Sequence, residues 1–115
     1  MQKADFDRSI ATARGVAGRL KPGAAEVDRT GAFPRAGLGA LAETGFCGLI
    51  VSGDHGGMDA PRGLFASVVA EIAAACASTA LAYVTNAVVA KAIDFAGTGA
   101  AASRWLPGLM DGRLL

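Results

Sequence analysis

The sequence is poor in cysteine, histidine and charge, and each shortage excludes a class of protein. Two cysteines among 115 residues, Cys47 and Cys76, are too few for a disulfide framework, so we expect reduced and buried thiols. A single histidine makes every mechanism that needs a histidine base depend on His55. The net charge of +1 is too small to bind nucleic acid or anionic lipid by charge.

The sequence also shows no recognisable secretory signal, transit peptide or membrane-spanning segment. No apolar core of a secretory signal follows Met1, and Asp5 and Asp7 among the arginines are atypical of a transit peptide. The uncharged run over residues 72–90 is interrupted by polar side chains and is rich in alanine, which favours membrane insertion weakly. We therefore predict a cytoplasmic protein in which this run forms a buried helix pair and no membrane span.

Small side chains are what the sequence has in abundance. Glycine (16) and alanine (26) supply 42 of the 115 residues, and the hydrophobic fraction of 52% excludes a disordered chain. Alanine is the best helix former and is depleted from strands. The composition therefore favours one domain of closely packed helices over a sheet.

Periodic apolar residues predict helices in the first 45 residues. A stripe at helical spacing begins at Phe6 and stops at the Pro22-Gly23 pair. A later helix opens with Pro34 at its first position and closes at Gly45, which we expect to adopt a left-handed cap. The predicted helices cover residues 6–20, 24–28 and 34–44, and residues 46–59 are predicted to be an extended segment and a loop.

The second half is predicted to be almost entirely helical. Pro61 restarts the helical pattern, and the apolar run over residues 64–95 is too long for one ordinary helix. We place a break at Ser78 and Thr79, because both are good N-cap residues, so that two antiparallel helices form. A last helix over residues 100–109 gives five or six helices around a core of small side chains.

Two local patterns contain residue types that functional sites use. Ser52, Asp54 and His55 are the types of a hydrolase triad, but neighbours in sequence do not converge on one point. A metal site made of Asp54, His55 and Asp59 would contain only one strong ligand, His55. Residues 37–42 (GLGALA) match the loose dinucleotide pattern G-x-G-x-x-G/A, yet they lie inside a predicted helix. We expect a loop histidine beside a Gly-Gly turn, and glycines that allow close helix packing.

Glu71 is the one acid within a broad apolar helix face. Such a carboxylate is either paired with an arginine or shifted in pKa. We expect a structural ion pair, so this residue does not indicate acid–base chemistry.

Five short motifs occur in order along nearly the whole chain. Residues 28–34 (DRTGAFP) fit D-R-x-G-x-F-P, and residues 41–49 (LAETGFCGL) fit L-x-E-x-G-(L/F)-x-G-L, followed by an acidic-aromatic-Gly-Gly loop at residues 54–57. Residues 71–78, 96–98 and 104–112 fit E-(L/I)-A-x-x-x-A-S, A-G-(T/S) and (R/K)-(W/Y)-L-P-x-(L/M)-x-x-G. Together they resemble the N-terminal helical domain of the acyl-CoA dehydrogenase family. Asp59 stands where the family often has glycine, so the loop is expected to turn differently.

The resemblance implies an all-α fold, a five- to six-helix up-and-down orthogonal bundle over residues 1–115. It also implies part of an FAD-dependent oxidoreductase of fatty acid metabolism, in which a carboxylate takes the α-proton of an acyl-CoA thioester and the β-hydride passes to the flavin. The family's middle β domain and C-terminal helical domain have no counterpart in these residues. We therefore expect a fragment, a truncated gene product or one piece of a split enzyme, with no catalytic residue, no bound FAD and no activity of its own.

The family's helix that matches residues 79–95 lends one wall to the acyl-chain pocket. Helical spacing puts Ala80, Val84 and Val88 on one stripe, with Leu81 and Thr85 beside it. We predict that these five side chains face the substrate, the alternative being an ordinary interhelical core.

The resemblance also implies partners: the acyl-CoA substrate, the β and C-terminal domains, further copies in a dimer or tetramer, and an electron-transfer flavoprotein. Two alternatives stay open. In the first, the chain is a piece of a flavin monooxygenase of the same fold; in the second, it is a helical interaction module that catalyses nothing. A chain without its other domains is expected to expose an apolar patch and to self-associate.

Overall fold

The computed structural model describes residues 1–114, and this part of the chain consists of helices and turns without a strand. The all-α prediction is therefore confirmed. The elements are α1 (Lys3–Leu20), η1 (Lys21–Gly23), α2 (Ala24–Thr30), α3 (Arg35–Glu43), η2 (Phe46–Gly48), η3 (Gly53–His55), α4 (Arg62–Ala75), α5 (Ala77–Ala96) and α6 (Gly99–Asp111), where η denotes a 3₁₀ turn.

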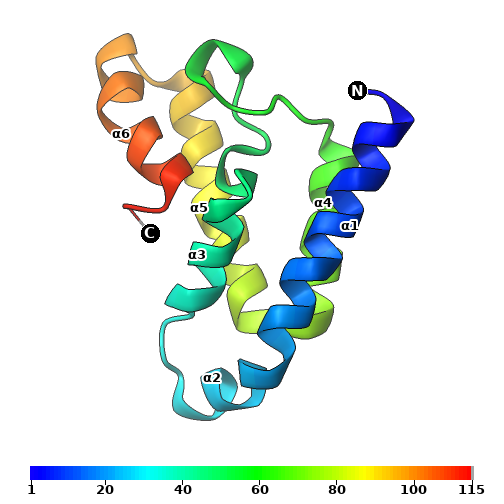
Figure 1. Ribbon diagram of the computed structural model, residues 1–115. Coiled ribbons are helices and arrows are strands. Elements are labelled where there is room, and N and C mark those ends of the chain that lie inside the picture. The colour runs from blue at the N-terminus through cyan, green and yellow to red at the C-terminus, as the bar shows by residue number, and fades with distance from the viewer. Residues whose placement is uncertain (115) are drawn as a thin grey trace.

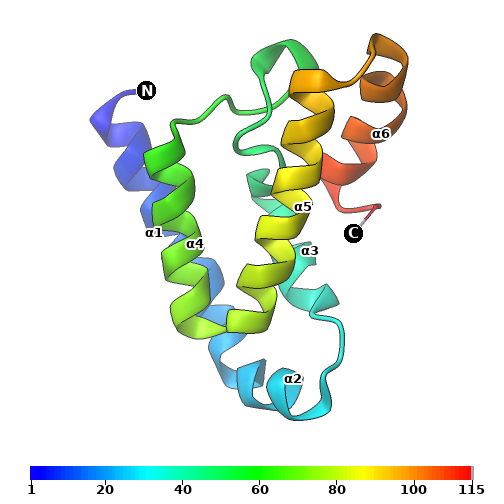
Figure 2. The same cartoon turned by 180° about the vertical axis from the view of Figure 1, so that it is seen from behind.

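The long helices run up and down in a molecule that measures 40 × 33 × 18 Å. α1 packs on α4, α4 on α5 and α5 on α6, while α2 closes the lower end (Figure 1). The view from behind shows α4 and α5 nearest the viewer, joined by a sharp turn and diverging upward (Figure 2). α5 contacts α3, α4 and α6, and is the central helix of the domain.

The main core lies between α1, α3, α4, α5 and η2. Its largest fully buried side chains include Leu38, Leu41, Leu64, Ile72 and Tyr83. The expected ion pair is confirmed, because Arg14 Nε lies 3.1 Å from Glu71 Oε1 and ties α1 to α4. A second, smaller cluster forms where α5 meets α6.

Glycine allows α3 to approach α5 closely at one of the two predicted positions. A Cβ built on Gly37 would lie 2.6 Å from Thr79 Oγ1 and 2.7 Å from Thr79 Cγ2, which is too close for any real contact. A Cβ on Gly39 would meet nothing within 4 Å. The helix-packing interpretation is therefore confirmed for Gly37 and wrong for Gly39.

The break between α4 and α5 lies at Cys76, so the prediction of Ser78 and Thr79 was wrong by two residues. Cys76 is extended, with φ −153° and ψ 101°. Thr79 does not cap the helix, because its side chain is buried against Gly37 and its hydroxyl donates to Cys76 Sγ at 3.2 Å. None of the helices within residues 1–114 combines the length and the apolarity that crossing a membrane requires.

Residues 46–59 were expected to begin with an extended segment, but they form the 3₁₀ turns η2 and η3. The backbone carbonyls of this segment accept hydrogen bonds from residues 58–60, which fold back onto it, and not from a neighbouring strand. The Met58 amide donates to the Gly48 carbonyl and the Ala60 amide to the Leu49 carbonyl, both at 2.9 Å. Asp59 adopts a left-handed conformation (φ 51°), which glycine adopts without strain. The remaining helix ends agree with the sequence predictions to within three residues, and Pro34 precedes α3 by one residue.

Candidate functional site

α5 presents apolar side chains on the face that points away from the core. Leu81 is 71% exposed and Val88 is 57% exposed, while Thr85 is exposed and Val84 is partly buried. Ala80, the fifth residue predicted to face the substrate, is 5% exposed and packs inside the main core. Within residues 1–114, Leu81 and Val88 therefore do not belong to an ordinary interhelical core.

This surface continues to Phe95, which is 87% exposed and was not predicted. Phe95 lies seven residues after Val88, two helical turns along the same face, so the same periodicity points to it. We call Leu81, Val84, Thr85, Val88 and Phe95 the α5 stripe. At 1.5 Å per residue, the fourteen steps from first to last give a length of about 21 Å.

The chemistry of the α5 stripe suits an apolar ligand. Thr85 is its only polar side chain, and the Thr85 hydroxyl already donates to the Leu81 carbonyl at 2.9 Å. The stripe therefore offers apolar contact without a hydrogen-bond donor. A flavin ring and its phosphates need such donors, so these residues do not fit FAD.

A mixed pocket of about 620 Å³ lies between α4 and α5; we call it the α4–α5 pocket. Ile50, residues 59–62, Phe65 and Lys91 line it. The Phe65 ring packs on the Tyr83 ring, with centroids 5.6 Å apart. Lys91 follows Val84 by seven residues and Val88 by three, so the pocket lies beside the α5 stripe.

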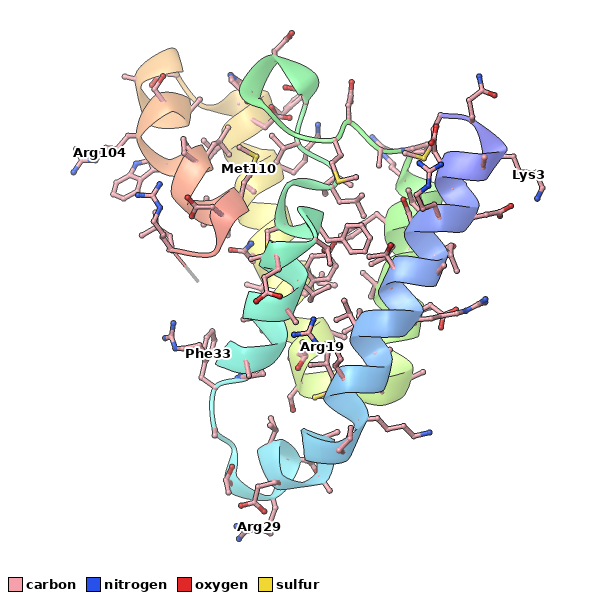
Figure 3. All side chains as sticks on the ribbon, in the orientation of Figure 1. Lys3, Arg19, Arg29, Phe33, Arg104 and Met110 are labelled. Carbon is pink, nitrogen blue, oxygen red and sulfur yellow. The ribbon has the colours of Figure 1, made fainter. Side chains whose placement is uncertain are left out.

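A second, apolar pocket of about 300 Å³ lies where α5 meets α3 and α6, next to Thr85 of the stripe. Phe33, Leu38, Thr85, Asn86, Val89 and Leu109 contribute to its lining. Figure 3 shows Phe33 at the beginning of α3, at the outside of the domain. Asn86 Nδ2 donates to the Leu109 carbonyl at 3.4 Å, which ties α5 to α6.

Asp94, near the end of α5, gathers the polar groups of the η3 region. Its side chain is 3% exposed. Asp94 Oδ1 accepts hydrogen bonds from Ser52 Oγ (2.6 Å) and His55 Nδ1 (2.7 Å), and Oδ2 accepts from Ser52 N (3.2 Å) and Lys91 Nζ (2.8 Å). Burial by itself would raise the pKa of Asp94, but the hydrogen bonds from Lys91, Ser52 and His55 lower it well below its ordinary value. Asp94 is therefore an ionised, buried carboxylate.

The predicted trio of Ser52, Asp54 and His55 does not assemble into a triad. Ser52 and His55 both bond to Asp94 and not to each other, so His55 is not placed as the base of the Ser52 hydroxyl. Asp54 is exposed. The loop-histidine interpretation is confirmed, since His55 ends η3 directly before Gly56, whose φ is +83°. The sequence did not point to Asp94, which lies 42 residues from Ser52.

Neither cysteine chemistry nor metal binding is favoured by the buried groups. Burial raises the pKa of the Cys47 thiol to about 11. Burial, and then the neighbouring Cys47, raise the pKa of the Tyr83 hydroxyl, which donates to the Phe46 carbonyl at 2.8 Å. Among residues 1–114 no three His, Cys, Asp or Glu side chains group closely enough to hold a metal, so Asp54, His55 and Asp59 do not come together.

The chain matches a known protein family. The chain fits the family model described as acyl-CoA dehydrogenase, N-terminal domain, over residues 9–113. No curated protein matches it. The matched range contains α2 to α6 complete, and with them the α5 stripe and both pockets.

Proposed function

The chain belongs to the acyl-CoA dehydrogenase family, as an N-terminal domain, and we propose that it forms one wall of the pocket for the acyl chain of an acyl-CoA thioester. The α5 stripe carries this proposal. It exposes Leu81 and Val88 on a helix whose other sides pack on α3, α4 and α6. A helix that is packed elsewhere but apolar on its outer side is expected to be covered by an apolar ligand or a further domain.

The role of the stripe is binding and exclusion of water. Each methylene group that the ligand buries on Leu81, Val84 or Val88 contributes about 0.8 kcal/mol. These side chains hold no proton that a reaction could use, so they position the acyl chain while other groups react. Because the stripe excludes water, the electrostatic interactions at the reacting end of the thioester also become stronger.

The complete enzyme is proposed to be an FAD-dependent acyl-CoA dehydrogenase. FAD, when bound, supplies the hydride acceptor, and no residue of the described chain is assigned to hold it. The middle β domain and the C-terminal helical domain, which the resemblance implies, form the opposite wall of the pocket and provide the base. Further copies of the enzyme and an electron-transfer flavoprotein are proposed partners of that complete protein.

A matched pair of valines tests this role in the complete enzyme. Val84 lies on the stripe, and Val27, which is also partly buried, lies on α2 outside the stripe. Val84→Phe narrows the proposed acyl-chain pocket and should shift the preference in kcat/KM toward shorter acyl groups. Each methylene that no longer fits lowers kcat/KM about fourfold. Val27→Phe adds the same bulk away from the stripe and should leave the chain-length profile unchanged.

The profile of kcat/KM against acyl length decides the outcome. A parallel shift by Val84→Phe and Val27→Phe would indicate a general disturbance of the domain. An unchanged profile for Val84→Phe would remove the stripe from the acyl-chain pocket.

A further inference from the structure

The α4–α5 pocket combines apolar surface with cationic groups beside the α5 stripe. Ala60, Pro61 and Phe65 supply apolar surface, and Arg62 and Lys91 supply positive charge. Lys91 shares a side of α5 with Val84 and Val88. An apolar chain that covers Leu81, Val84 and Val88 therefore reaches the pocket that Arg62 and Lys91 line.

Both cations have hydrogen-bond donors to spare. Arg62 is exposed, and none of the ion pairs within residues 1–114 involves it. Lys91 uses one of its three ammonium donors for Asp94 Oδ2, and its side chain remains 43% exposed. These two residues can therefore donate to an anionic group in the pocket.

The pocket is built by fixed elements. Asp94 bonds on one side to Ser52 and His55, which belong to the segment that carries Ile50 and residues 59–61. On the other side Asp94 holds Lys91 of α5. The same buried carboxylate therefore sets the position of two walls and the orientation of one cation.

Asp59 is the one acidic residue that lines the pocket, and it opposes an anion there. Two cations face this single carboxylate, and the charge of Asp94 is satisfied by its four hydrogen bonds. Arg62 and Asp59 should therefore act on an anionic ligand with opposite signs, which makes the pocket testable from both directions.

We propose that the α4–α5 pocket binds the anionic group, a carboxylate or a phosphate, of a ligand whose apolar chain lies on the α5 stripe. This inference rests on the proposed acyl-chain wall and adds to it a preference for amphipathic anions. The ligand class is an acyl chain that carries an anionic group in addition to its thioester.

Binding of small amphiphiles to the 115-residue chain tests the inference. The chain is titrated with octanoate, octyl phosphate, octanol and octylammonium below their micelle concentrations, and amide NMR shifts are followed. Octanoate or octyl phosphate should bind about two- to fivefold more tightly than octanol, as expected for one partly exposed charge pair, and octylammonium more weakly. The shifts should include Arg62 and Lys91 as well as Leu81 and Val88. The tighter of the two anions identifies which group the pocket takes.

Two substitutions that should change the affinity for the anion in opposite directions test the pocket more directly. Arg62→Gln should lower the affinity for the anion toward that for octanol, since only Lys91 remains, and Asp59→Asn should raise the affinity, because asparagine tolerates the left-handed conformation and removes the repelling charge. Lys21→Gln and Asp28→Asn make the same changes in net charge near the α2 end of the molecule and should leave the affinity unchanged. The affinity for octanol should not respond to any of the four.

The outcomes separate this inference from the proposed function. Equal binding of octanoate and octanol along the stripe, or equal effects of Arg62→Gln and Lys21→Gln, would overturn the anionic site and leave the acyl-chain wall in place. If none of the amphiphiles shifts Leu81 or Val88, the acyl-chain wall fails, and this inference fails with it.

Discussion

Gly37 and Gly39, two residues apart on α3, allow the packing of α3 against α5 to be measured directly. Alanine at Gly37 would place its Cβ 2.6 Å from Thr79 Oγ1 and 3.2 Å from Thr79 Cβ, whereas alanine at Gly39 would contact nothing. Thr79 is 2% exposed, so it has no open space into which to move. The two substitutions therefore differ in one respect, which is the contact with Thr79.

The expected energies follow from two effects. Replacing a helical glycine by alanine stabilises a helix by about 1 kcal/mol, and this gain applies to both positions. Overpacking a close contact costs about 1–3 kcal/mol, and this cost applies to Gly37→Ala alone. Gly39→Ala should therefore be about 1 kcal/mol more stable than the parent chain, and it should exceed Gly37→Ala by about 1–3 kcal/mol.

Urea unfolding followed by circular dichroism measures this difference. At about 4 °C per kcal/mol for a domain of this size, the two melting temperatures should also differ by roughly 4–12 °C. In a double-mutant cycle, Thr79→Ala should remove most of the cost of Gly37→Ala, because it deletes Oγ1 and Cγ2. Equal stabilities of the two alanine variants would refute the close approach of α3 and α5.

Two further predictions concern the buried polar groups. Asp94→Ala should lower the free energy of unfolding by about 2 kcal/mol at pH 7, since it leaves several hydrogen-bond donors unpaired while Lys91 and His55 keep access to water. The pKa of Asp94 is lowered in the folded state, so its contribution is fully present above the unfolded value near pH 4 and is lost as the pH falls from there through the lower folded value. Urea unfolding should therefore show a smaller stability difference between the parent and the variant at pH 3 than at pH 7, and a constant difference would contradict this. Cys47, with its pKa raised from 9.0 to about 11, should have about 100-fold less thiolate at pH 8 than in the unfolded chain, so a thiol reagent, with the modified peptide identified by mass spectrometry, should react with it slowly until urea is added. Equal reaction rates with and without urea would show that Cys47 is accessible.

The sequence predicted most of the fold because local patterns set most of it. The helical stripe from Phe6 to Leu20 and the left-handed cap at Gly45 depend on residues that are neighbours along the chain, and both are present in the structure. The break at Cys76 was misplaced because Thr79, a good capping residue by type, is used for packing against Gly37. That contact joins residues 42 positions apart, so local capping preferences did not indicate it.

The candidate site divides in the same way. Leu81, Val84 and Val88 could be placed on one face of a helix by their spacing alone. The exposure of that face depends on which helices cover α5. Ala80 was predicted to belong to the exposed face but is buried, so the spacing alone did not show where that face ends. Asp94 escaped notice because a single aspartate in a helix gives no local sign that Ser52 and His55 fold back onto it.

The inner side of α5 is held at three heights: Thr79 fits against Gly37, Tyr83 bonds to the Phe46 carbonyl, and Asp94 bonds to Ser52. A register error of one residue would rotate the helix by about 100° and break all three contacts at once. The outward residues take part in none of them. Half of the circumference of this helix therefore secures the architecture, and side chains on the other half can be exchanged without rebuilding the scaffold.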